Sequence, residues 1–338
     1  MPLKPESESP SFLQALGSLL GGGPKMVRTG VSTYGKLPIY KDFLRHGLAA
    51  REAQAFRHWL DRGFSRHWEA NDACRDHPIE PHAFSLRFEG LARRVVGCLW
   101  GSHDQGELRR FPFTLFVSVP VGGSIGDLAA VEVLGKVAEE ARNLRHAARE
   151  AGDVQGFYSR VRETSLTLRI ERDAAVRERL AEALREIPVR AFAESLYGAE
   201  AATAWPALLA WLTSRRAAAR KRESGAPPLA CRLPVSRLFP ALRQAELWAA
   251  LLQGIGAKGK APFNVLIPWG NEPAGGLLVL ERDLRPDDVQ VLHPDPPGYD
   301  LLEDLRTRVP AGKAAPPAAM HLGEEPLSAL LLPGAFGD

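Results

Sequence analysis

The sequence predicts an α/β protein built on a mainly antiparallel sheet flanked by helices. Residues 83–88, 95–100 and 111–119 form short apolar runs, and glycine-containing turns separate them. Strands joined by such short turns usually pair as an antiparallel meander. Two longer segments, residues 49–70 and 128–149, carry apolar residues at steps of three and four. This spacing predicts amphipathic helices that cover the sheet.

A strand and a structured loop precede the first of these helices. Residues 27–34 alternate in character and are predicted to form a strand. In the loop from Gly35 to Arg45, the glycine permits a tight turn and Pro38 holds the preceding residue extended. Charged residues stand beside apolar ones in this loop, which is typical of a recognition surface on a rigid scaffold. The alternative is a connection in which Phe43 and Leu44 only fill the core and Asp42 caps a local turn.

The second half of the chain is less regular and continues the α/β pattern. Helices are predicted over residues 154–162, 174–187, 201–221, 238–252 and 299–306. Strands are predicted over residues 166–170 and 229–235, with a hairpin over 263–269 and 275–281. We expect a flexible extension at 1–25, an α/β core at 26–150, a helical and α/β C-terminal part at 151–310, and a Pro/Ala-rich tail at 311–338. Met26 begins the first structured run and is a possible internal start.

Composition narrows the functional class. The net charge is only +3 over 338 residues, so neither nucleic-acid binding nor membrane attachment is indicated. No apolar run reaches the roughly 20 residues needed to cross a bilayer. The three cysteines, Cys74, Cys98 and Cys231, are far apart and form no C-x-x-C motif. This usage predicts a reducing, cytoplasmic compartment.

The motif that most resembles a cofactor site is unconvincing. Residues 254–261 satisfy both G-x-x-x-x-G-K and G-x-G-x-x-G, but they follow a predicted helix and precede a predicted strand. A phosphate loop requires the opposite order, and Ala261 lacks the hydroxyl that would hold Mg²⁺. The histidines show no metal-binding spacing, and no G-x-S-x-G motif occurs. We therefore predict no cofactor, no metal and no catalytic residue.

Two stretches carry a family resemblance. The first joins Gly-Lys-Leu-Pro at 35–38 to Asp-Phe at 42–43, and the second joins Asp104 to Arg-Phe-Pro-Phe-Thr at 110–114. Together they resemble the TagF (ImpM) family associated with the bacterial type VI secretion system. The family pattern runs approximately G-K-L-P-x-x-G-D-F, then S-x-D-x-x-G-R-x-F-P-L-T. Lys41 departs from the glycine of the first motif, and residues 107–109 add length to the second.

The resemblance implies a longin-like α/β fold with a C-terminal α/β extension. It also implies a non-enzymatic, cytoplasmic accessory protein that restrains type VI secretion after translation. The implied partner is the forkhead-associated scaffold protein Fha or a neighbouring component.

We predict that the two stretches lie close together and form or support the partner surface. The candidate motif residues are Tyr34, Gly35, Lys36, Leu37, Pro38, Asp42, Phe43, Arg45, Asp104, Arg110, Phe111 and Pro112. Lys36, Arg45 and Arg110 are the preferred contacts, whereas Asp42 and Phe43 are expected to be structural first. One alternative is an enzyme with a polar pocket at Lys36, Asp42 and Arg110. The other is an assembly adaptor without a regulatory role.

Overall fold

The computed structural model describes residues 24–70, 72, 78–121, 126–220, 230–254, 263–269, 276–293, 302–306 and 323–332. Nearly all of the expected N-terminal extension, most of the glycine-rich motif at 254–261, and much of the expected tail lie outside these residues.

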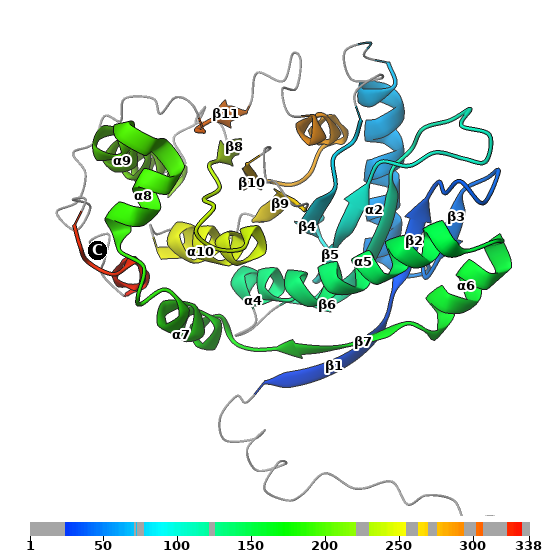
Figure 1. Ribbon diagram of the computed structural model, residues 1–338, viewed down its shortest axis with the longest axis horizontal. Helices are drawn as coiled ribbons and strands as arrows, with labels where there is room; N and C mark the ends of the chain where they lie inside the picture. The colour runs from blue at the N-terminus through cyan, green and yellow to red at the C-terminus, as the bar shows by residue number, and fades with distance from the viewer. Residues whose placement is uncertain are drawn as a thin grey trace, which may run out of the picture.

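A central sheet organises the described residues. It has nine strands in the order β11-β8-β10-β9-β4-β5-β6-β2-β3 (Figure 1). The strands are β2 (Ser32–Gly35), β3 (Leu44–His46), β4 (His82–Arg87), β5 (Arg93–Trp100), β6 (Phe113–Pro120), β8 (Ala230–Leu233), β9 (Asn264–Pro268), β10 (Leu277–Leu280) and β11 (Glu303–Asp304). Every neighbouring pair is antiparallel except β11 with β8. The predicted α/β class with a mainly antiparallel sheet is confirmed.

Helices cover both faces of the sheet. The α-helices are α2 (Arg51–Gly63), α4 (Asp127–Glu132), α5 (Leu134–Glu150), α6 (Val154–Glu163), α7 (Asp173–Ala183), α8 (Val189–Tyr197), α9 (Ala201–Arg220) and α10 (Ala241–Gly254). Shorter turns are η1 (Phe64–Trp68), η2 (Gly198–Glu200), η3 (Pro286–Leu292) and η5 (Leu327–Leu331). In Figure 1, α4, α5 and α10 lie across one face, and α2 stands against the other.

The sheet separates two hydrophobic clusters. Along β5, Val96 and Cys98 belong to the cluster that contains α5 and α10, whereas Val95 and Leu99 belong to the cluster that contains α2. Side chains alternate between the two faces of a strand, so a central strand with helices on both sides is apolar at every position. This explains why residues 95–100 of β5 appear in the sequence as a continuous apolar run.

The predicted strand at residues 27–34 proved to be two strands in different sheets. The chain changes sheet at Val31, because β1 (Lys25–Gly30) pairs with β7 (Ser165–Ile170) as a separate antiparallel ribbon. Alternate residues of β7 are buried, so this ribbon packs one face on the body. Residues 32–35 continue as β2 beside β6.

Other differences also come from tertiary contacts. The helix predicted at 299–306 is wrong over its described part, because Glu303 and Asp304 pair with β8 and form the edge strand β11. Helix α8 was not predicted. Its first backbone N–H groups, at Val189 and Arg190, donate to the carbonyls of Glu325 and Gly323 at 2.9 and 3.3 Å. A segment over a hundred residues away in sequence thus supplies the cap that helix starts require.

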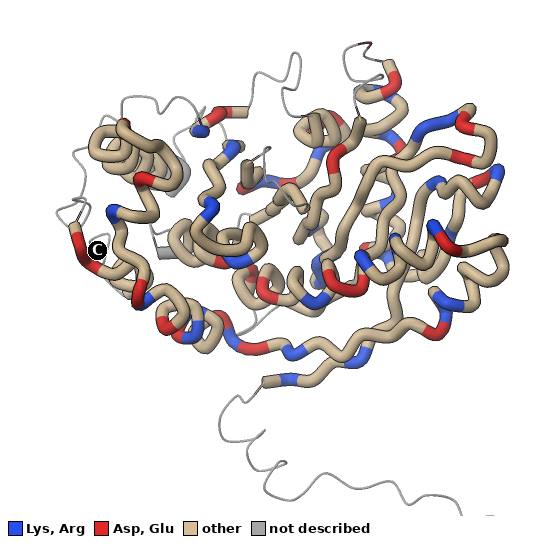
Figure 2. Tube along the Cα trace, viewed as in Figure 1, with Lys and Arg blue, Asp and Glu red and all other residues tan. Residues whose placement is uncertain are grey.

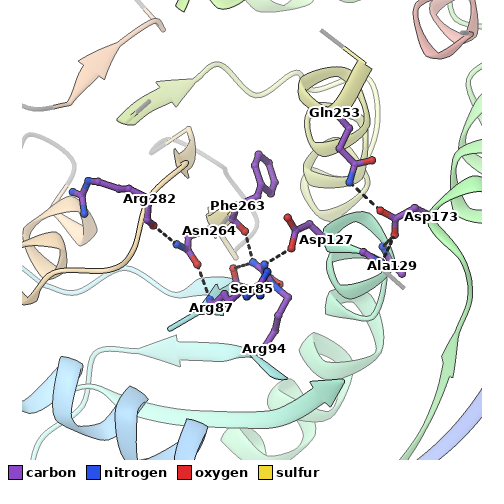
Figure 3. A network of polar contacts seen from close by, with 11 residues as sticks. Ser85, Arg87, Arg94, Asp127, Ala129, Asp173, Gln253, Phe263, Asn264 and Arg282 are labelled. Atoms are coloured by element: carbon purple, nitrogen blue, oxygen red, sulfur yellow. Dashed lines mark hydrogen bonds and ion pairs between the residues drawn. The ribbon is translucent and has the colours of Figure 1, made fainter. Parts of the chain in front are cut away.

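A buried arginine joins the first and second halves of the chain. The Arg94 guanidinium of β5 donates to the Asp127 carboxylate at 2.5 Å and to the Ser85 hydroxyl at 2.9 Å (Figure 3). It also donates to the backbone carbonyl of Phe263, which directly precedes β9. Strands from both sides of the expected boundary at residue 150 therefore lie in one sheet and share a polar network. The boundary between the α/β core and the C-terminal part at residue 150 stays a prediction.

Polar contacts extend the network on either side of Arg94. The Asn264 side chain accepts the Arg87 N–H at 2.6 Å and donates to the Arg282 carbonyl at 2.7 Å. On the other side, Asp173 accepts the N–H of Ala129 at 2.9 Å and the amide of Gln253 at 3.0 Å (Figure 3). These bonds tie α4, α7 and α10 to one another.

Candidate functional site

The structure brings the two sequence stretches together where β2 meets β6. Gly35 ends β2 with φ of 137°, in the half of backbone space that favours glycine. A Cβ at this position would lie 2.1 Å from the carbonyl oxygen of Pro112 and 2.7 Å from the Cα of Phe113. Only glycine allows this close approach, so the first motif residue directly supports the second stretch.

Residues 102–111 form a tight hairpin before β6. The Asp104 N–H donates to the Arg109 carbonyl at 3.1 Å, and the Phe111 N–H donates to the Ser102 carbonyl at 3.0 Å. Glu107, at the tip, has φ of 59°, a left-handed conformation that few residues other than glycine adopt. We call residues 102–111 the signature hairpin.

A buried carboxylate holds the hairpin to the first loop. The Asp104 side chain, 3% exposed, accepts the N–H of Arg109 at 3.0 Å and its Nε at 2.9 Å. The Lys36 ammonium lies 3.4 Å from the same carboxylate. The Arg109 backbone N–H, followed by the Arg109 side chain and the Lys36 charge, lowers the Asp104 pKa from 3.8 to about 2. Asp104 is therefore ionised and pairs with both cations.

Lys36 is not a surface residue. Its side chain is 1% exposed, its ammonium donates to the Lys41 carbonyl at 3.1 Å, and it lies 4.6 Å from the Phe43 ring centroid. The expectation that Lys36 contacts a partner is therefore wrong. The buried ammonium is used inside the protein, because a charge removed from water needs an ion partner and hydrogen bonds.

Aromatic rings fill the space under both loops. Phe43 stacks on Tyr34 at 5.3 Å between ring centroids and meets the edge of Phe111 at 4.9 Å. Phe111 in turn contacts Phe64 at 4.8 Å. The Tyr34 hydroxyl donates to the Asp61 carboxylate, and burial together with this bond raises the Tyr34 pKa. These rings anchor the loops on α2 and η1.

The remaining motif residues divide into buried and exposed groups. Leu37 and Pro112 are buried, and Pro38 is exposed. Asp42 is exposed and accepts the N–H of Phe43 at 2.7 Å, the local bond expected for it. Arg45 is exposed on β3, where its backbone N–H donates to the Tyr158 hydroxyl of α6 at 3.0 Å.

Arg110, one of the preferred partner contacts, lies at the surface. Its side chain is exposed, and within the described residues it has no hydrogen bond or ion pair. The Asp104 partner is Arg109 instead. Counting back from Phe-Pro in the family pattern G-R-x-F-P leaves one residue between Arg and Phe, which places Arg109 at the arginine position. This residue count was the signal in the sequence that could have identified Arg109 as the partner of Asp104.

A cavity of about 380 Å³ opens beside the signature hairpin. The aromatic rings of Phe64 and Trp68 line it from η1. The other lining residues are Glu69, Glu107, Leu108, Arg109 and Arg110. Phe64 and Trp68 belong to the apolar face predicted over residues 49–70, and both are buried. Both signs of charge occur in the hairpin, where Asp104 and Glu107 precede Arg109 and Arg110, and both signs are spread along the trace in Figure 2.

The three residues of the enzyme alternative do not converge. Lys36 points to Asp104, Asp42 bonds to its neighbour's N–H, and Arg110 lines the hairpin cavity. A catalytic centre needs polar groups directed at one point. These three residues provide no such point.

A match to a known protein family covers the residues of the two stretches. Residues 32–164 match the family model described as the TagF N-terminal domain, type VI secretion system-associated. The chain carries a TagF domain. The match begins at β2, includes both signature stretches and ends directly after α6, so the resemblance read from the motifs is confirmed. The type VI secretion association is that of the domain matched by residues 32–164.

One solved structure gives a partial likeness. The crystal structure of PA0076 from Pseudomonas aeruginosa PAO1 aligns at 21% identity with a TM-score of 0.33. The alignment covers 42% of this chain and 65% of the PA0076 chain. No curated protein matches the chain. Among the described residues, none of the helices combines the length and apolar character that a membrane span requires.

Proposed function

We propose that this TagF-domain protein is a non-enzymatic accessory component that restrains type VI secretion after translation by binding an Fha-type scaffold in the cytoplasm. The domain match to a type VI secretion-associated family supports the assignment to that secretion system. The arrangement of the two signature stretches supports binding rather than catalysis.

The observation that carries the proposal is the closed ion cluster of Asp104, Lys36 and Arg109. Asp104 and Lys36 are buried, the Arg109 side chain is 61% exposed, and the two ion pairs on Asp104 hold the two loops in a fixed relation. A perturbed pKa often marks a catalytic group, but this one arises from saturated pairing. The cluster therefore acts as a support, and the groups left for a partner lie on its exposed rim.

The exposed rim has the chemistry of a protein contact. Arg45 and Arg110 are exposed, and Leu108 extends from the hairpin tip with 86% of its surface accessible. Tyr40, on the facing loop, is also exposed. Arginine and tyrosine are enriched where protein interfaces bind most strongly, and rigid loops lose little entropy on binding.

A binding measurement tests the partner. Purified full-length protein is titrated with purified Fha from the same organism, and affinity is measured by calorimetry. We expect saturable binding that falls on the order of tenfold in a folded Asp42→Ala, Arg110→Ala double variant. Arg237→Ala, which removes another exposed arginine, is the control and should bind like the wild type. Undiminished binding by the double variant would remove these residues from the interface, and no binding by the wild type would exclude Fha.

A secretion measurement separates restraint from assembly. Deleting the gene in its host should raise type VI secretion if the protein restrains the system, because its inhibitory contact is lost. An assembly adaptor without a regulatory role gives the opposite result, with lower secretion. Messenger RNA for the secretion genes should stay unchanged if the restraint acts after translation.

A further inference from the structure

The cavity beside the signature hairpin has an aromatic base and a charged edge. Phe64 and Trp68 stack at 6.1 Å between centroids and are almost fully buried from solvent. Leu108, although it lines the same cavity, is 86% exposed. Because the two rings are already buried, Leu108 is the lining residue whose apolar surface gains most from burial by another apolar group.

The hairpin presents Leu108 rigidly. Backbone hydrogen bonds join Asp104 to Arg109 and Phe111 to Ser102, and a further bond joins Gln105 to the Tyr40 carbonyl at 3.0 Å. The neighbouring Glu107 keeps its unfavourable left-handed φ of 59°. A strained residue persists only where surrounding contacts hold it, and such positions concentrate at functional sites. Leu108 is therefore exposed by the construction of the hairpin.

The charges around the cavity identify the kind of occupant. Arg109 is paired with Asp104, whereas Arg110 has no pairing partner within the described residues. Glu69 and Glu107 also line the cavity. Two carboxylates would repel a polyanion such as a nucleotide, and the two aromatic rings expose almost no surface, so the exposed Leu108 must supply most of the apolar contact. Arg110 can still orient one nearby carboxylate through a bidentate contact.

We propose that this cavity receives a bulky apolar side chain of the partner protein, with an adjacent carboxylate of the same partner segment paired to Arg110. The inference rests on the proposed function and names the chemistry of its contact. A volume of about 380 Å³ accommodates one large side chain and part of its neighbours. Apolar anchors seated in pockets of this kind dominate many protein interfaces.

The first test measures binding of purified Fha by full-length variants. Leu108→Asp removes the apolar wall and adds a negative charge, and Arg110→Glu reverses the orienting charge. Both should weaken binding on the order of tenfold or more. Leu238→Asp and Arg237→Glu are matched controls, because Leu238 is 49% exposed and the adjacent Arg237 is also exposed. These controls should bind like the wild type.

This test separates the two proposals. Binding of Fha by the wild type with equal binding by Leu108→Asp and Arg110→Glu would overturn the cavity inference and leave the proposed function standing. Circular dichroism and the unfolding midpoint establish that each variant is folded, and Leu108→Ser provides a milder change at the same position. Full affinity in Leu108→Ser together with Arg110→Ala would likewise overturn the inference.

The second test does not depend on Fha being the partner. A photo-crosslinking amino acid, benzoylphenylalanine, is placed at residue 108 or residue 238 of the full chain in the host, and the crosslinked peptide is sequenced. We expect a crosslink from residue 108 alone, to Fha, at an apolar residue next to Asp or Glu. The same kind of segment in another secretion component would support the cavity and exclude Fha. A crosslink to a basic or wholly polar segment, or equal labelling from residue 238, would overturn the inference.

Discussion

Replacing Gly35 by alanine should destabilise the protein by about 1 to 6 kcal/mol, because two penalties combine at this position. The first is the backbone φ of 137°, which costs a residue with a Cβ roughly 1 to 3 kcal/mol. The second is steric. The added carbon would lie 2.1 Å from the Pro112 carbonyl oxygen, so β2 and β6 must move apart. Overpacking of this kind costs about 1 to 3 kcal/mol, and reduced freedom of the unfolded chain returns up to about 1 kcal/mol.

Two other glycines separate these penalties. Gly90 has a φ of 69° but no atom within 4 Å of the added carbon. Gly90→Ala should therefore cost only about 1 to 2 kcal/mol, from the backbone conformation. Gly30 has neither a positive φ nor a close neighbour. Gly30→Ala should be neutral or stabilise the protein by up to about 1 kcal/mol.

Urea denaturation followed by fluorescence gives the free energy of unfolding for the wild type and the three variants. The expected order of destabilisation is Gly35→Ala, then Gly90→Ala, then Gly30→Ala. Gly35→Ala should also weaken partner binding, since it displaces the start of β6 and the hairpin before it. If Gly35→Ala and Gly90→Ala differ by less than about 0.5 kcal/mol, the steric contact with Pro112 has no energetic weight and the reasoning fails.

Three further predictions concern a buried charge, a carboxylate and the C-terminal segment. Lys36→Met should lose about 2 to 4 kcal/mol in urea denaturation because it breaks a buried pair, whereas the exposed Lys136→Met should lose under about 1 kcal/mol. Asp104 has a folded pKa of about 2, below its usual 3.8, so its stabilisation is lost as pH falls through that interval. Asp104→Asn should accordingly flatten the stability profile there, and an unchanged slope would contradict the ion cluster. Leu327→Ala should cost about 2 to 5 kcal/mol because the side chain is fully buried, and Leu332→Ala, at a residue 61% exposed, should stay within about 0.5 kcal/mol.

Local sequence pattern was sufficient for most regular elements. The apolar face over residues 49–70 predicted α2 and η1, and the closely spaced runs predicted β4, β5 and β6 in antiparallel order. The hairpin strands predicted at 263–269 and 275–281 are present as β9 and β10, which pair antiparallel. Each of these signals lies within about twenty residues, where helical or strand periodicity is expressed directly.

Elements defined by distant contacts were missed or misread. The run at 27–34 looks like one strand, yet its first part pairs with β7, more than 130 residues later. Residues 303–304 became a strand because the edge of β8 was available to pair. Helix α8 begins where carbonyls from residues 323 and 325 receive its first N–H groups. No local propensity contains the identity of such partners.

The sequence by itself determined which two stretches matter, because Gly-Lys-Leu-Pro with Asp-Phe and the later Phe-Pro carry the TagF resemblance. Only the tertiary structure decided what their side chains do. It buried Lys36, selected Arg109 over Arg110 as the partner of Asp104, and left Leu108 exposed beside an aromatic cavity. The physical reason is that the sequence of a loop does not show whether a charged side chain faces water or an opposite charge. Burial and distance, which depend on the packing of β2 against β6, choose between them.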